Sequence, residues 1–142
     1  MQKNKFDELY TKMEEARKLY QAGEQEKSRQ NYGKIKETLK EQETEFNKIW
    51  SMYDKAKENG NQYIDFHDVI WDNEVEGIVK TLRDNGIERF TFSSGWTSAV
   101  KTAWLFKENG CTLEGLTEVY DGFEDFTTGK KTKIPAYLFK VN

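Results

Sequence analysis

The stretch Asn85-Gly86-Ile87-Glu88-Arg89-Phe90-Thr91-Phe92-Ser93-Ser94-Gly95 contains a helix stop, a strand and a turn in direct succession. An Asn-Gly pair is a common end of a helix, and a run of aromatic and β-branched residues is typical of a strand. The Ser-Ser-Gly segment then turns the chain toward a second helix. This stretch predicts a domain in which helices and strands alternate.

The residues on either side extend the same pattern. An amphipathic helix is expected from Asp72 to Asp84, and residues 112–120 and 132–141 are expected to form two strands joined by a long loop. The order α-β-α-β-β predicts an α+β protein with a small mixed α/β sheet, in which Pro135 argues for an edge position or a bulge. In the second helix, which ends at Asn109-Gly110, one face is expected to be buried and consists of Trp96, Ala99, Val100, Ala103 and Trp104.

Residues 1–60 are expected to form a helical arm, separate from a small α/β domain at 62–142. Apolar residues recur there every three or four positions, and a second helical run is expected to continue unbroken over 24–58. Because the apolar stripe is narrow, it needs a partner surface. Two arrangements fit: the first helix folds back at Gly23 as an antiparallel hairpin, or the long helix forms a coiled coil with a second copy, giving a homodimer.

Composition narrows the class of protein. The chain has 142 residues, of which 14% are aromatic, and a disordered chain lacks such a load. Residues 1–60 carry 13 Lys/Arg and 12 Asp/Glu (+1), and residues 61–142 carry 9 and 13 (−4), which gives the total of −3. Neither of these two parts of the chain has the excess of basic residues that is typical of a nucleic-acid-binding protein. The absence of a long apolar run and of a secretory signal predicts a cytoplasmic protein with no membrane segment.

Several segments of the second half resemble a family of small uncharacterised proteins of gut Firmicutes and their plasmids and phages. The resemblance rests on Phe90-Thr91-Phe92-Ser93-Ser94, on the helix that contains Trp104, on 109–116 and on Ala136-Tyr137-Leu138-Phe139-Lys140, and covers residues 62–142. The family has no assigned activity, so no site residue follows from it. It implies a mobile-element context, in which small acidic proteins often inhibit host defence systems, as anti-CRISPR proteins do.

Two segments are weak candidates for chemistry. Asp65, His67, Asp68 and Asp72 have the ligand types of a divalent-cation site, although helix capping by Asp65 or Asp68 is the simpler interpretation. At Ser93-Ser94-Gly95, an N-cap by Ser94 is favoured over anion binding, and a nucleophilic serine would require His67 as its base. Cys111 is expected to be a buried structural thiol. The sequence therefore predicts no catalytic residue, no cofactor and no metal, and a protein that is not an enzyme.

The leading hypothesis is a non-catalytic protein that binds a host protein or a protein–nucleic acid complex, as an inhibitor of a host defence system would. Its expected binding residues are at the tip of the last hairpin, where aromatic and acidic residues are interleaved: Phe123, Glu124, Asp125 and Phe126. The alternative is a nucleic-acid-associated protein that uses Lys34, Lys36 and Lys40 of the arm to contact phosphates. A metal-dependent enzyme is a third and weaker alternative. The sequence does not identify the partner.

Overall fold

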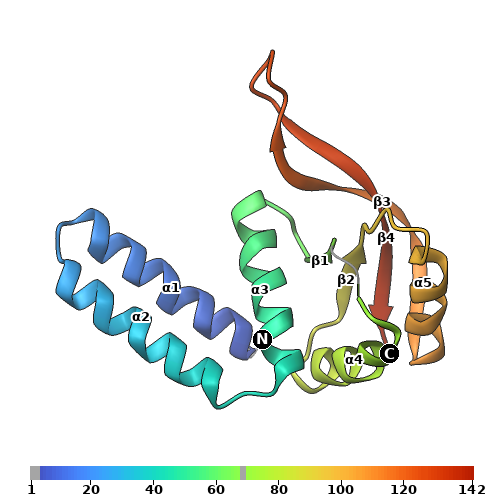
Figure 1. The fold of residues 1–142 in the computed structure, drawn as a ribbon, viewed down its shortest axis with the longest axis horizontal. Helices are drawn as coiled ribbons and strands as arrows, with labels where there is room; N and C mark the ends of the chain where they lie inside the picture. Colours follow the sequence, from blue (N-terminus) through green and yellow to red (C-terminus); the bar gives the residue numbers. More distant parts are fainter. Residues whose placement is uncertain (1–3, 68–69) are drawn as a thin grey trace. The chain divides into compact units, whose positions relative to one another are not determined.

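The computed structural model describes residues 4–67 and 70–142, and the chain divides into two compact units, 1–50 and 51–142 (Figure 1). The division falls after Trp50, inside a helix, whereas the sequence places the end of the arm near Gly60. That residues 1–60 form a separable module stays a prediction.

The first unit is built on a helical hairpin. Helices α1 (Lys5–Gln21) and α2 (Gln25–Lys40) pack against each other, and Gly23 between them has φ +82°, a backbone conformation that favours glycine. The buried Ser28 Oγ donates a hydrogen bond to the carbonyl oxygen of Ala16 at 2.7 Å, which ties the two helices together. The expected helical arm is confirmed, as a pair that folds back at Gly23.

The unbroken second helix expected over 24–58 is wrong. The chain leaves the helical path after α2 and begins a new helix, α3 (Thr44–Asn59). The side chain of Asn47 explains the break, because its Nδ2 donates to the carbonyl oxygens of Leu39 at 3.0 Å and Glu43 at 3.2 Å. A side chain that satisfies the Leu39 carbonyl group stabilises the end of α2, as a capping residue does, and the bond to Glu43 lies at the start of α3. Within the first unit, Phe6 and Phe46 stack with ring centroids 4.5 Å apart.

The second unit confirms the α+β class and contains one strand more than expected. After α3 come strand β1 (Ile64–Phe66), a short 3-10 helix η1 (Asp72–Glu74), α4 (Val75–Asp84) and β2 (Arg89–Phe92). Helix α5 (Ala99–Glu108) and the long strands β3 (Cys111–Glu124) and β4 (Lys131–Val141) follow. The sheet order is β1-β2-β4-β3. Strand β1 was missed because three buried residues are too few to show an alternating pattern.

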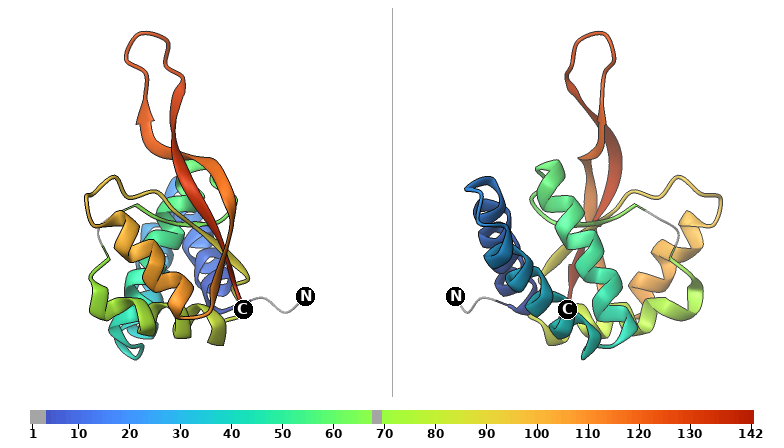
Figure 2. Two further views of the ribbon diagram at one scale, coloured as in Figure 1. Left: turned by 90° about the vertical axis from the view of Figure 1, so that its right-hand side faces the viewer. Right: turned by 60° about the vertical axis from the view of Figure 1, so that its left-hand side comes forward.

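The sheet is mixed, as expected. Strands β1 and β2 are parallel, whereas β4 is antiparallel to both β2 and β3. Only Tyr137–Lys140 of β4 pair with β2, so Pro135 lies beyond that pairing and faces β3 alone, opposite Glu118. Proline is thus tolerated in an inner strand because one side of that strand is locally an edge. Beyond the sheet, β3 and β4 continue together as a projecting hairpin (Figure 2).

The apolar core of this unit is formed by the sheet, by α5 and by the buried face of α4. The ring of Phe106 on α5 has its centroid 4.8 Å from that of Phe90, 5.4 Å from Phe139 and 5.6 Å from Phe92. The face of α5 that the sequence assigned to the core is therefore wrong. Trp96, Val100 and Trp104 are 65%, 75% and 53% exposed, because Phe106 and Thr102 are the side chains that cover the sheet.

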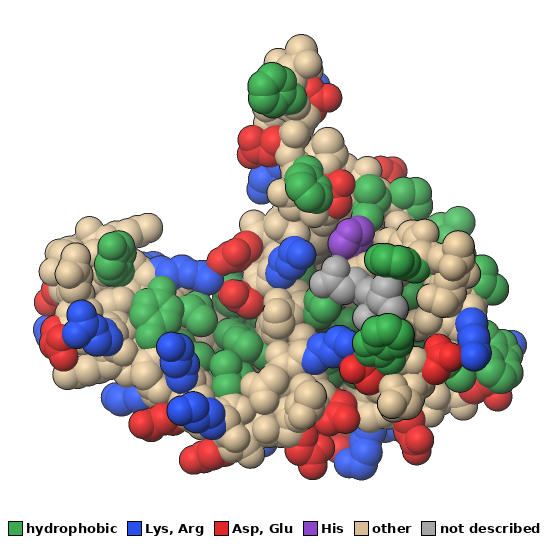
Figure 3. All heavy atoms as spheres, viewed as in Figure 1, with side chains coloured by type: hydrophobic (Ala, Val, Ile, Leu, Met, Phe, Trp, Pro, Cys, Tyr) green, Lys and Arg blue, Asp and Glu red, His purple; other side chains and the backbone are tan. Residues whose placement is uncertain are grey.

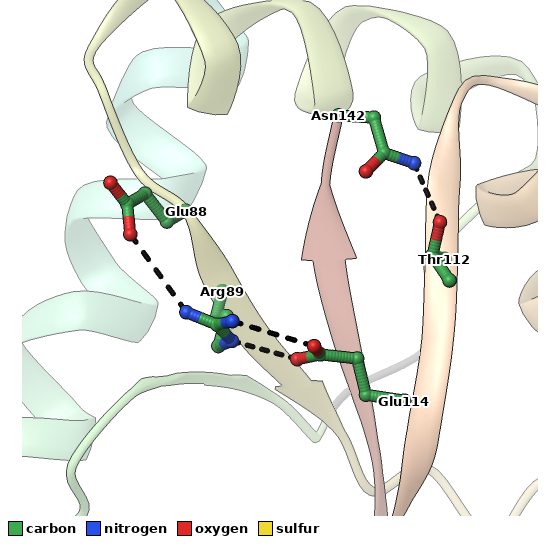
Figure 4. A network of polar contacts seen from close by, with 5 residues as sticks. All are labelled: Glu88, Arg89, Thr112, Glu114 and Asn142. Carbon is green, nitrogen blue, oxygen red and sulfur yellow. Dashed lines mark hydrogen bonds and ion pairs between the residues drawn. The ribbon is translucent and has the colours of Figure 1, made fainter.

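Side-chain contacts connect β3 with β2 and with the end of the chain after β4 (Figure 4). Arg89 of β2 reaches across β4 and donates from Nε to Glu114 Oε1 of β3 at 2.7 Å. Glu114 sits at an irregularity of register between Leu113 and Gly115, which turns its side chain toward Arg89. The hydrogen bond from Arg89 lowers the pKa of Glu114. Asn142 Nδ2 donates to Thr112 Oγ1 at 2.6 Å, which fixes the end of β4 to β3.

The packing of α5 leads to a first prediction. Phe106→Ala should lower the free energy of unfolding by about 3–5 kcal/mol, because it removes a fully buried ring and leaves a cavity. Trp104→Ala, a larger truncation on the same helix, should lower it by less than about 1 kcal/mol because that ring is exposed. Urea unfolding followed by circular dichroism measures both. Equal losses would contradict the orientation of α5.

Candidate functional site at the carboxyl ends of the parallel strands

A buried carboxylate joins the two parallel strands. Asp65 of β1 pairs in register with Thr91 of β2 and is 8% exposed. Its Oδ1 accepts a hydrogen bond from Thr91 Oγ1 at 2.7 Å, and its Oδ2 accepts one from Ser93 Oγ at 2.7 Å. Thr91 and Ser93 are two residues apart and therefore point to the same face of the sheet. The helix-capping role considered for Asp65 is wrong, because this carboxylate accepts its hydrogen bonds from side chains of and just after strand β2.

His67 continues this chain of hydrogen bonds. Its Nδ1 lies 3.0 Å from Ser93 Oγ, and the backbone N–H of Ser93 donates to the carbonyl oxygen of Phe66 at 3.0 Å, which extends the strand pairing past the end of β1. Ser93 has one hydroxyl hydrogen, and an ionised Asp65 takes it. The serine oxygen can then only accept, so Nδ1 of His67 carries a hydrogen, and in the neutral imidazole Nε2 carries the lone pair.

The environment of Asp65 works against its charge. Burial raises the pKa of Asp65 above its ordinary value, and the hydrogen bonds from Ser93 and Thr91 partly offset that rise. The positive charge of Lys55 acts in the same direction as the hydrogen bonds. The two hydroxyl groups are therefore what keeps a carboxylate tolerable at this buried position.

An open pocket of about 530 Å³ lies beside this chain of hydrogen bonds. Its polar lining comes from His67, Ser93 and Ser94, at the carboxyl ends of β1 and β2. The volume is in the range of small-molecule sites. The apolar lining comes from β2, β3 and β4 and consists of Phe92, Leu116, Ile134, Pro135, Ala136 and Tyr137.

The metal candidates do not assemble into a site among the described residues. No group of three or more His, Cys, Asp or Glu side chains there is close enough to hold a metal ion. Asp65 and His67 are both bound to Ser93, while Asp72 forms an ion pair with Lys101 of α5 at 2.8 Å. Asp68 lies outside the described residues.

The N-cap expected at Ser94 is wrong. Helix α5 begins only at Ala99, and the Oγ of Ser94 accepts a hydrogen bond at 3.4 Å from the backbone N–H of Trp96, two residues on. Cys111 is buried, as expected, and burial raises the pKa of its thiol to about 11. A thiol with so high a pKa is not ionised at neutral pH and is a poor nucleophile.

The binding residues predicted on the hairpin lie at its tip. Phe126 is fully exposed, and Phe123 is 70% exposed. Asp125 shapes the turn, because its Oδ1 accepts from the backbone N–H groups of Thr127 at 2.8 Å and Thr128 at 3.0 Å, and these bonds lower its pKa. Glu124, the last residue of β3, is exposed as well. The four predicted residues are thus neighbours on one projecting element.

The three lysines of the arm are exposed but do not form one strip. With about 3.6 residues per turn, Lys34 lies roughly half a turn around α2 from Lys36, whereas Lys40 falls on the same side as Lys36. The phosphate-facing strip of the alternative hypothesis is therefore divided between two sides of the helix.

Two features escaped the sequence reasoning. The sequence singles out Asp65, His67 and the Ser93-Ser94 turn as weak candidates, but it does not show that Asp65, Ser93 and His67 form one chain of hydrogen bonds, because Asp65 and Ser93 are 28 positions apart. The second feature is the outward face of α5, where Val100 and Trp104 are neighbours one turn apart. The sequence does give one indication of this face, because α5 has more apolar residues than a small sheet can cover.

A family comparison places most of this fold in a known group. Residues 48–141 match the domain of unknown function DUF7698, and the chain belongs to this family. The match takes in β1 to β4 and most of α3, and leaves α1 and α2 outside. It confirms the resemblance of the second half to an uncharacterised family. The origin in gut Firmicutes and mobile elements is not tested by it and stays a prediction.

One curated protein shows partial similarity. The chain is 34% identical over 95 residues to an enolase-phosphatase E1 of Shewanella amazonensis. That stretch covers 66% of this chain but only 36% of the enolase-phosphatase. No solved structure matches the chain. Among the described residues, no helix is long and apolar enough to cross a membrane.

The hydrogen bond to Asp65 supports a second prediction. Ser93→Ala should lower the free energy of unfolding by about 1.5–3 kcal/mol near neutral pH, because it removes a bond to a buried charged group. Since Ser93 lowers the pKa of Asp65, its loss raises that pKa further. A raised carboxyl pKa means stability that is present at low pH and lost as pH rises. The difference between variant and wild type should therefore grow from about pH 3 toward neutrality.

Urea unfolding across that pH range measures the difference. Ser94→Ala is the matched control, because Ser94 has no hydrogen bond to Asp65 among the described contacts. A pH-independent loss for Ser93→Ala, or the same pH profile for Ser94→Ala, would show that Ser93 does not support an ionised Asp65.

Proposed function

We propose that the protein is a non-catalytic binding protein that attaches to another protein through the tip of the β3–β4 hairpin. The observation that carries this proposal is the full exposure of Phe126 at the end of an element that projects beyond the sheet. An exposed aromatic ring gains free energy when a partner buries it, and aromatic anchors are frequent at the centre of interfaces.

The tip is held in one shape before any partner arrives. The backbone N–H of Asp125 donates to the carbonyl oxygen of Lys130 at 2.6 Å, and that of Gly129 donates to the carbonyl oxygen of Asp125 at 2.8 Å. Further down, Thr132 Oγ1 donates to Asp121 Oδ1 at 2.5 Å, and Asp121 also accepts from the backbone N–H of Phe123. A preorganised loop loses less conformational entropy on binding.

The charges of the outer part of the hairpin, residues 121–133, are balanced. This part carries Asp121, Glu124 and Asp125 on the outgoing side and Lys130, Lys131 and Lys133 on the returning side. Hydrophobic, acidic and basic side chains are all visible along this element (Figure 3). Two of the three carboxylates are also engaged by the hairpin itself. The partner surface that fits best is therefore an apolar pocket with a polar rim of both signs.

The finer form of this proposal, an inhibitor of a host defence complex such as an anti-CRISPR protein acting in the cytoplasm, is supported by the resemblance of residues 62–142 alone. The nucleic-acid alternative gains no specific support from the placement of Lys34, Lys36 and Lys40. Attachment through an apolar pocket also predicts a weak dependence of binding on salt, in contrast to phosphate binding.

A third prediction tests the hairpin. Phe123→Ala combined with Phe126→Ala should leave the melting temperature within about 2 °C of the wild type, because both rings are exposed. The same variant should lose the partner captured from a lysate of the organism that encodes the protein. Replacing Phe126 with the photoreactive p-benzoylphenylalanine should cross-link that partner directly.

The matched control is Val100→Ala combined with Trp104→Ala, which removes comparable exposed apolar surface from α5. We expect this control to retain the partner. Loss of capture only in the α5 variant would move the interface to α5 and overturn the hairpin proposal. Capture that survives both variants, or that fades steeply with rising salt, would also contradict it.

A further inference from the structure

The pocket beside His67 has a mainly apolar wall, and the His67 side chain is part of its polar lining. Within the described residues, Nε2 of His67 has no hydrogen-bond partner, while Nδ1 is engaged by Ser93. Behind Ser93 stands Asp65, and both of these polar side chains are more than nine-tenths buried. Burying a chain of polar side chains costs free energy unless every member is hydrogen-bonded. Here the chain leads to His67, which lines the pocket.

The chain fixes what His67 can offer. Because Asp65 takes the hydroxyl hydrogen of Ser93, Nδ1 donates, and in the neutral imidazole Nε2 is an acceptor. A ligand that meets His67 at Nε2 must therefore bring an O–H or N–H group. The remaining wall, which includes Phe92, Tyr137 and Leu116, offers apolar contact.

We propose that this pocket binds a small, mainly apolar molecule that carries a hydroxyl or N–H group and donates it to Nε2 of His67. The volume of about 530 Å³ suits a molecule of one or two fused rings with substituents. Ser93 and Asp65 are positioning residues that hold the imidazole in the accepting form. This site is separate from the hairpin tip, so the two proposals stand or fall independently.

Two probes of the same shape test the proposal. 2-Naphthol carries a hydroxyl hydrogen, whereas 2-methoxynaphthalene presents the same rings without one. Equilibrium dialysis with the full-length protein should show saturable binding of both, with 2-naphthol bound roughly fivefold more tightly, the size expected for one net hydrogen bond. No saturable binding of either probe, or equal affinity for both, would overturn the proposal.

Variants of this chain then locate the site. His67→Asn retains a donor near the position of Nδ1 and removes Nε2, so the preference for 2-naphthol should disappear while 2-methoxynaphthalene binds as before. Leu116→Glu places a charge in the wall of the pocket at a 75% exposed position, and should weaken both probes at least tenfold.

Leu113→Glu is the control, since Leu113 is an exposed residue of the same strand outside the pocket. It should leave both affinities unchanged. An unchanged preference in His67→Asn, or equal weakening by Leu113→Glu and Leu116→Glu, would show that the probes bind elsewhere and would overturn the assignment. A thermal melt of each variant confirms that it is folded.

Discussion

The buried carboxylate of Asp65 fixes how the two parallel strands of the second unit pair. Asp65 cannot stay ionised away from water unless donors surround it, and Thr91 and Ser93 supply them from the neighbouring strand. These bonds exist only in the register that pairs Asp65 with Thr91, since a shift by one residue would turn the hydroxyl groups to the opposite face. The carboxylate thereby selects one register for a strand of only three residues.

As a result, one face of the sheet is apolar and the other carries polar side chains at β1 and β2. Phe66, Phe90 and Phe92 alternate with Asp65, Thr91 and Ser93, so one face packs against Phe106 of α5 while the other carries the hydrogen-bonded polar chain. His67 and Ser93 emerge where the two strands end, beside the pocket. Strands β3 and β4 are longer than β2, and the part of them that extends past β2 carries the exposed hairpin tip. The pocket and the hairpin tip thus follow from one short strand pair and one long strand pair.

The sequence predicted what periodicity can show. The helical arm, α4, β2 and the β3–β4 hairpin each have apolar spacings or turn residues that identify them locally. The failures have a common physical cause, since they depend on contacts between distant residues. Asn47 ends α2, Phe106 rather than Trp104 covers the sheet, and Asp65 meets Ser93 only once β1 and β2 pair. The cluster at the candidate site could not be read from spacing because its members lie in separate elements.

The most direct test of this account is the protonation of the one histidine in the chain. Nitrogen-15 NMR of protein labelled at histidine gives signals from His67 alone, at a pH where an imidazole is neutral. The account predicts that Nδ1 carries the hydrogen and Nε2 does not, and that Ser93→Ala shifts the balance toward the Nε2-protonated form. A wild-type imidazole protonated at Nε2 would contradict the chain from Asp65 through Ser93 to His67.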